Sequence, residues 1–91
     1  MREQILKMLL SGEVRIIFLR RTDGLLRELL CTLNINDIPP EQYNTLSSTL
    51  QSTDDQKMVV WDIEKNDWRS FYFDSIVSVK MSEQKKQIEG Q

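Results

Sequence analysis

Acidic and hydroxyl side chains that catalysis could use gather in one region, at Asp62, Glu64, Asp67, Ser70, Asp74 and Ser75. A serine needs a neighbouring base to become a nucleophile, and histidine, the usual base, is absent from the sequence. Asp62 and Asp67 lie at the two ends of an expected hairpin turn, where carboxylates commonly stay solvated. The sequence therefore predicts that the protein is not an enzyme and has no catalytic residues.

Metal and thiol chemistry are also disfavoured. With no histidine and a single cysteine, only carboxylates remain as ligands, and none has the spacing of a calcium loop. Cys31 lies in a leucine-rich segment, where a buried small hydrophobic side chain is a better interpretation than a reactive thiol. We expect no metal and no cofactor. Because Cys31 has no disulfide partner, we expect a reducing compartment.

Basic and aromatic side chains suggest a binding surface. Arginines concentrate in the first half of the chain, and a second group combines an arginine with aromatic residues. The candidate binding residues, for protein or nucleic acid, are Arg15, Arg20, Arg21, Arg27, Trp68, Arg69 and Tyr72. Small barrels bind single-stranded nucleic acid by combining a cationic groove with stacking aromatic rings. The competing interpretation is structural, since Trp61 alternates with apolar residues and Arg20-Arg21 beside Asp23 is typical of a solvated turn.

An apolar surplus points instead to a protein partner. Val14, Ile16 and Phe18 occupy one face of the first expected strand, while Ile17 and Leu19 occupy the other. A sheet with one face in water alternates apolar and polar residues, so either a helix or a partner chain must cover the second face. We expect another protein as the partner. RNA or single-stranded DNA is the alternative.

The first elements that must position these residues are a helix and a hairpin. Apolar spacing predicts a helix over 2–11, which Gly12 ends. Alternating β-branched and aromatic residues predict a strand over 13–21. Asp23-Gly24 is typical of a tight turn, and we expect 25–33 to form the returning strand.

The remaining segments are expected to be a loop, three strands and a tail. Two adjacent prolines and many polar residues predict a long loop over 34–56. Strands are predicted at 57–63, 68–73 and 76–81, followed by a polar tail at 82–91. Five short strands in meander order favour closure into a small barrel. We thus predict a mainly β fold, in which residues 1–81 form one five-stranded barrel domain with an N-terminal helix.

Several segments carry a resemblance to a known family: TDGLLRELLCTL at 22–33, IPPE at 38–41, VWDIEK at 60–65, WRSF at 68–71 and DSI at 74–76. In these the chain resembles a WYL-related, Sm-like SH3-barrel family of small proteins from tailed, T4-like bacteriophages. The last two segments are also similar to the closing segment of WYL domains, which sense ligands or bind nucleic acid. The literal Trp-Tyr-Leu motif is absent, so the resemblance implies the fold without a defined ligand.

The resemblance implies a small phage accessory protein that binds a host or phage protein and modulates a host or phage process, as in host takeover. It also implies a homo-oligomer, because Sm-like barrels often assemble by pairing of edge strands. The length of 91 residues fits one domain, and the net charge of −2 argues against a polycation that binds DNA through bulk charge. No apolar run approaches the ~20 residues that span a bilayer. We therefore expect no membrane association and a location in the cytoplasm of the host cell.

Overall fold

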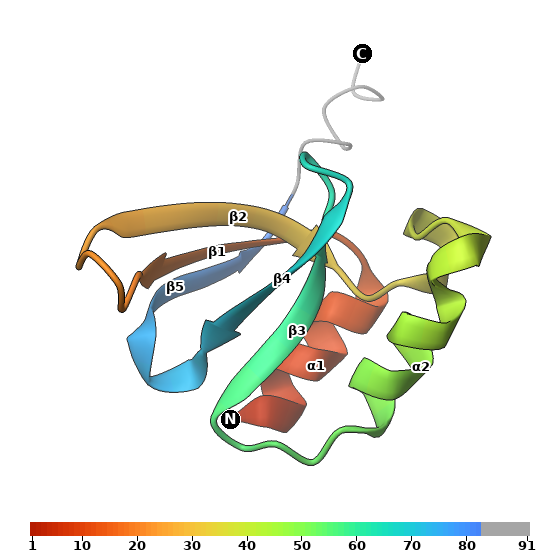
Figure 1. Ribbon diagram of the computed structural model, residues 1–91, viewed down its shortest axis with the longest axis horizontal. Coiled ribbons are helices and arrows are strands. Elements are labelled where there is room, and N and C mark those ends of the chain that lie inside the picture. The colour runs from red at the N-terminus through yellow and green to blue at the C-terminus, as the bar shows by residue number, and fades with distance from the viewer. Residues whose placement is uncertain (83–91) are drawn as a thin grey trace.

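The computed structural model describes residues 1–82, which form a strongly bent five-stranded sheet with two α-helices (Figure 1). The elements in chain order are α1 (Arg2–Ser11), β1 (Val14–Leu19), β2 (Leu26–Thr32), α2 (Tyr43–Gln51), β3 (Lys57–Asp62), β4 (Asp67–Tyr72) and β5 (Ile76–Met81). Three short 3₁₀ helices lie between them, at Ile35–Asp37, Pro40–Gln42 and Phe73–Ser75. The mainly β fold with an N-terminal helix is confirmed.

The N-terminal helix and the last strand have the predicted bounds. Strands β1, β2 and β3 are shorter than predicted by one to three residues, and β4 has the predicted length but begins and ends one residue earlier. Helix α1 buries Ile5 and Leu9, which lie four residues apart and therefore on one face. The first hairpin turns at Gly24, whose φ of 72° is open to glycine without steric cost. The Gly24 N–H donates to the Arg20 carbonyl at 2.8 Å, and the Arg20 N–H donates to the Leu25 carbonyl at 2.8 Å.

The sheet is antiparallel, with strand order β4-β3-β2-β1-β5. The prediction of a closed barrel is wrong, since β4 and β5 are the two edges of an open sheet and no ladder joins them within residues 1–82. The reason lies in two connections. Strands β2 and β3 pair at only two positions, Cys31↔Asp62 and Thr32↔Trp61, so the sheet bends away there. The short 3₁₀ helix Phe73–Ser75 then brings the chain to β1, and β5 pairs with β1 alone.

The prediction of a loop over 34–56 is also wrong, because this segment contains α2 and two 3₁₀ helices. Helix α2 has weak intrinsic support, since serine and threonine are mediocre helix formers. It is held by tertiary contacts instead. Leu46 is buried in the core, and the Thr49 hydroxyl donates to the Val59 carbonyl of β3 at 2.8 Å.

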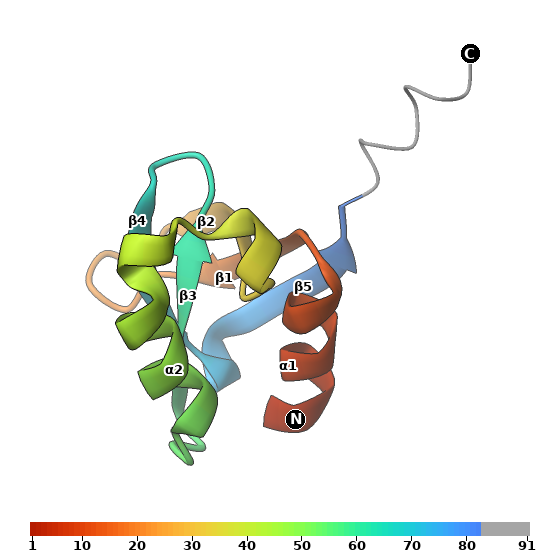
Figure 2. The same ribbon diagram turned by 90° about the vertical axis from the view of Figure 1, so that its right-hand side faces the viewer.

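The core lies between the bent sheet and the helices. Its members are apolar side chains with little or no exposure: Ile5, Leu9, Val14, Ile16, Phe18, Leu29, Cys31, Leu33, Ile38, Leu46, Met58, Val60, Trp61, Phe71 and Phe73. Trp61 is among them, which confirms that it faces the core. Figure 2 shows α1 and α2 on the same side of the molecule, so the end formed by the β1–β2 turn has no helix over it.

The predicted tail over 82–91 lies, Ser82 apart, outside the described residues. Over residues 1–82, neither α-helix is long and apolar enough to pass through a lipid bilayer.

Candidate functional site

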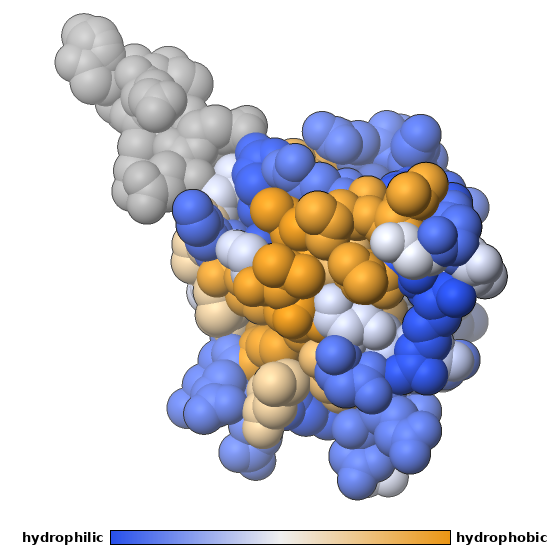
Figure 3. All heavy atoms as spheres, turned by 90° about the vertical axis from the view of Figure 1, so that its left-hand side faces the viewer, coloured by the Kyte–Doolittle hydropathy of each residue, from blue (hydrophilic) through white to orange (hydrophobic). Residues whose placement is uncertain are grey.

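An exposed apolar surface covers the end of the molecule opposite the helices. It consists of Leu19, Leu25, Leu26 and Val77, and we call it the hairpin-end surface. Leu25, Leu26 and Val77 are 60%, 59% and 61% exposed, and apolar side chains that gather into one exposed patch are typical of interaction sites. Leu19 pairs with Leu26 across β1 and β2, so the two side chains share one face. Figure 3, which looks at this end, shows apolar side chains gathered into one patch with hydrophilic residues around it.

Two adjoining hollows lie beside this surface, between β4 and the β1–β2 hairpin. The first has a volume of about 370 Å³ and is lined by Phe18, Arg20, Arg27, Leu29, Arg69 and Ser70. The second has a volume of about 340 Å³ and is lined by Phe18, Leu19, Arg20, Arg21, Thr22, Ser70, Phe71 and Tyr72. Because both include Phe18, Arg20 and Ser70, they form one depression, which we call the groove. It follows the side of β4 on which the sheet stays open.

The groove brings together five of the seven predicted binding residues: Arg20, Arg21, Arg27, Arg69 and Tyr72. The Arg21 guanidinium lies 3.7 Å from the centre of the Tyr72 ring, in a cation–π contact. The same guanidinium pairs with Asp74 at 2.6 Å. The Tyr72 ring is therefore held against the turn between β1 and β2.

Acidic neighbours offset most of the groove's positive charge. Arg20 pairs with Asp23 at 2.6 Å, and this hydrogen bond is the main reason why the pKa of the Asp23 carboxyl is lowered. Arg69 lies 3.8 Å from the buried carboxylate of Asp62 and 3.5 Å from that of Asp67.

Arg27 differs from the other arginines of the groove. It makes no ion pair with any residue in the described range 1–82 and lies half-buried against the hollow. It is therefore the cation of the groove with the least local compensation.

The other two predicted binding residues lie elsewhere. Arg15 pairs with Glu28 at 2.5 Å, across β1 and β2. The Trp68 indole N–H donates to the Gln42 side chain at 2.9 Å, and the Trp68 ring packs edge-on against Trp61. Trp68 thus helps to fix the segment before α2 rather than offering a free stacking platform.

Cys31 is fully buried, as expected for a small hydrophobic side chain. Burial, with a smaller contribution from the charge of Asp62, raises the pKa of the Cys31 thiol to about 12. Within residues 1–82 no three side chains of the histidine, cysteine, aspartate or glutamate types are grouped as metal ligands. The absence of catalysis stays a prediction.

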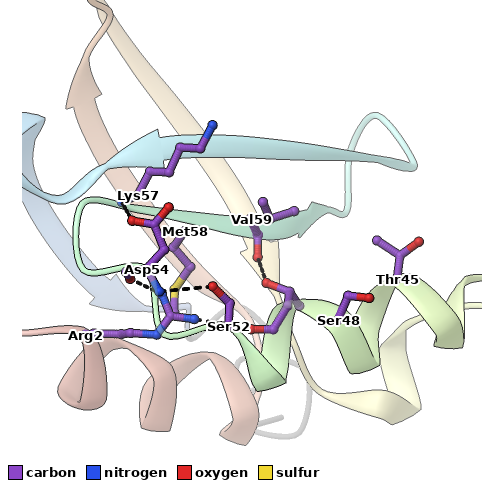
Figure 4. Close-up of a pocket in the computed structure, with 9 residues that line it drawn as sticks. Arg2, Thr45, Ser48, Ser52, Asp54, Lys57, Met58 and Val59 are labelled. Atoms are coloured by element: carbon purple, nitrogen blue, oxygen red, sulfur yellow. Dashed lines mark hydrogen bonds between the residues drawn. The ribbon is translucent and has the colours of Figure 1, made fainter.

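A smaller cleft of about 180 Å³ lies where the start of α1 meets α2 and β3 (Figure 4). The Arg2 guanidinium donates to the carbonyls of Thr49 and Asp54, at 3.2 and 2.9 Å. The Asp54 carboxylate accepts from the amides of Gln56 and Lys57, which lowers its pKa. These hydrogen bonds connect the start of α1 to the end of α2, so we interpret the cleft as a structural junction.

The sequence did not identify the hairpin-end surface as such. Apolar residues on both faces of the first hairpin were the available signal, and they left open whether a helix covers the second face. The structure places both helices elsewhere, which leaves Leu25 and Leu26 in solvent. Val77 gave no such signal, because it becomes exposed through an irregularity in the β1–β5 pairing near Ile17 and Phe18.

Comparison with known proteins gives two matches. The family model described as WYL_2, Sm-like SH3 beta-barrel fold, matches residues 2–77. The chain is also 29% identical over 76 residues to a protein of Enterobacteria phage T4, described as an uncharacterized 11.5 kDa protein in the Gp31-cd intergenic region. That alignment covers 84% of this chain and 74% of the phage protein. No solved structure gives a significant match.

Proposed function

Because this chain belongs to the WYL_2, Sm-like SH3 β-barrel family, we propose that it is a non-catalytic binding module that attaches to another protein through the hairpin-end surface. The observation that carries the proposal is the exposure of Leu25, Leu26 and Val77 on one end of a small domain. Burying a leucine or valine from water is worth about 1.5–3 kcal/mol when it is complete. Covering this surface would therefore contribute substantially to association.

The neighbouring groove supports a protein partner over nucleic acid. Affinity for nucleic acid rests mainly on arginine and lysine that neutralise phosphates. Here Arg20, Arg21 and Arg69 already face carboxylates of the same chain. Arginine and tyrosine beside apolar side chains are instead typical of protein interfaces.

The setting of the proposal is a phage infection. The T4 relative is a phage protein, and we propose that this chain is likewise a phage accessory protein that modulates a host or phage process in the host cytoplasm. The relative is described as uncharacterized, so it offers no partner by name.

Site-specific photo-crosslinking tests the proposal. A photoreactive amino acid replaces Leu26, and a matched control carries it at Asn44, an exposed residue of α2. After irradiation in infected enterobacterial cells, we expect a discrete protein adduct from position 26 that is missing at position 44. Adducts that are identical at both positions, or absent from both, would refute a protein site at this surface.

A second assay addresses RNA or single-stranded DNA. Fluorescence anisotropy with labelled oligonucleotides at low salt should show no binding, because the groove carries little uncompensated charge. Binding that weakens steeply with added salt would favour the nucleic-acid alternative.

A further inference from the structure

Strand β4 offers an unpaired backbone edge to the groove. It is an outer strand of the sheet and pairs with β3 alone. Its partner β3 has Val59 opposite Ser70. In the same register the Phe73 amide donates to the Gln56 carbonyl at 2.9 Å, so that pair faces inward, and Val59 and Ser70, three residues along, face outward. In an antiparallel pair, opposed residues turn their backbone groups either toward each other or both away. Ser70 therefore presents its amide and carbonyl to the open side.

Trp68, two residues before Ser70 in β4, should turn its backbone groups to the same open side. The Trp68 amide donates to the Asp67 side chain at 2.8 Å. Ser70 also lines both hollows of the groove. The free backbone edge and the groove thus coincide along β4.

The side chains around this edge define what would complement it. Phe18 and Leu29 give the first hollow apolar walls, and both are nearly buried. Arg27 and Arg69 enter the same hollow, and Arg27 has no ion-pair partner within the described residues. A half-buried cation without a counter-charge favours a carboxylate from outside.

We propose that the groove receives an extended segment of the partner protein, which pairs with the free edge of β4 and places an acidic side chain against Arg27. Strand addition of this kind takes affinity from the main chain and specificity from alternate side chains. The inference rests on the proposed function, because the segment belongs to the same protein partner, and it adds the chemistry of that segment.

Charge argues against a second copy of this chain as the donor of the segment. The other free edge of the described sheet is β5 (Ile76–Met81), which contains Lys80 and no acidic residue. Paired with β4 of a neighbour, it would bring a further cation to Arg27 and Arg69. An acidic segment from another protein fits better.

Fluorescence anisotropy with labelled peptides of about six residues, the usual length of a strand, tests the proposal. One peptide alternates valine with glutamate, a second replaces glutamate with lysine, and a third N-methylates alternate amides of the first. We expect the glutamate peptide to bind and the other two to bind at least about tenfold more weakly. Arg27→Glu should weaken the glutamate peptide by about tenfold or more and favour the lysine peptide. Arg15→Glu, a charge reversal outside the groove, should change neither affinity more than about twofold.

Three results would overturn the proposal. The first is a glutamate peptide that fails to bind with a Kd below about 1 mM. The second is an affinity that does not change with peptide charge or N-methylation. The third is an Arg15→Glu effect as strong as that of Arg27→Glu, in variants that keep the wild-type circular dichroism. Self-association that excludes the peptide, detected by light scattering, would assign the edge to a second copy instead. Crosslinking from Leu26 separates the two proposals, because adducts that persist without peptide binding leave the proposed function standing. Peptide binding without such adducts would mean that the partner does not use the hairpin-end surface.

Discussion

Thr32→Val should destabilise the protein although it preserves the shape of the side chain. Thr32 is fully buried, and its hydroxyl donates to the Gly12 carbonyl at 2.8 Å and accepts the Asn34 N–H at 3.0 Å. It thus joins the end of α1 to the end of β2. Valine leaves both backbone groups without this partner, at about 1–3 kcal/mol for each group that stays shielded from water. Both contacts are only partly buried, so we expect a total loss of about 2–3 kcal/mol.

Urea denaturation followed by circular dichroism measures this loss. The midpoint should fall while the slope stays constant, because the surface exposed on unfolding hardly changes. The melting temperature should drop by about 10–20 °C for a domain of this size. Thr45→Val is the matched control, since Thr45 is exposed on α2 and should change stability by less than about 0.5 kcal/mol. If the two variants are equally stable, the Thr32 hydroxyl does not fasten α1 to the sheet.

Further predictions concern the thiol, α2 and an acidic residue. The native Cys31 thiol, with its pKa raised to about 12, should react with a thiol reagent at pH 8 only in urea, and rapid labelling without urea would contradict its burial. Thr49→Val should lower the unfolding free energy by about 1–2 kcal/mol in the same urea assay, because the Val59 carbonyl loses its donor; an unchanged midpoint would mean that packing alone holds α2. The folded Asp54 carboxyl should titrate below 3.8 by NMR, so its contribution to stability is present above that pH and disappears as the pH falls through the lowered pKa; a value at or above 3.8 would show that the amides of Gln56 and Lys57 do not bind it.

The predictable parts of the fold are those with a strong local signal. Helix α1 follows from apolar spacing that ends at Gly12, and the first hairpin follows from Asp23-Gly24. Helix α2 was not predicted, because its local sequence is rich in serine and threonine, while its stabilising partners lie in β3. The open state of the sheet was also not predicted, because it depends on how many residues of β2 and β3 pair with each other.

The candidate site was predictable in its residue types but not in its arrangement. Arg20, Arg27 and Arg69 were chosen for their charge, and the fold does bring them to one groove. Their acidic partners could not be foreseen, since Asp62 approaches Arg69 only through the β3–β4 register. Because these carboxylates neutralise the arginines, the groove is a mixed surface suited to protein rather than a cationic surface suited to nucleic acid.

The pairing of β5 with β1 has a consequence for how the chain is made. Ile17 of β1 pairs with Ser78 of β5, which is synthesised about 60 residues later, so β1 lacks one of its two neighbouring strands until then. At about 5–20 residues per second, synthesis leaves that side of β1 without its partner for several seconds. During that interval Ile16, buried in the finished protein, has no cover from Val79. The nascent chain is therefore most exposed to aggregation and to chaperones before its last strand appears, and slower translation of β5 should lower the yield of folded protein.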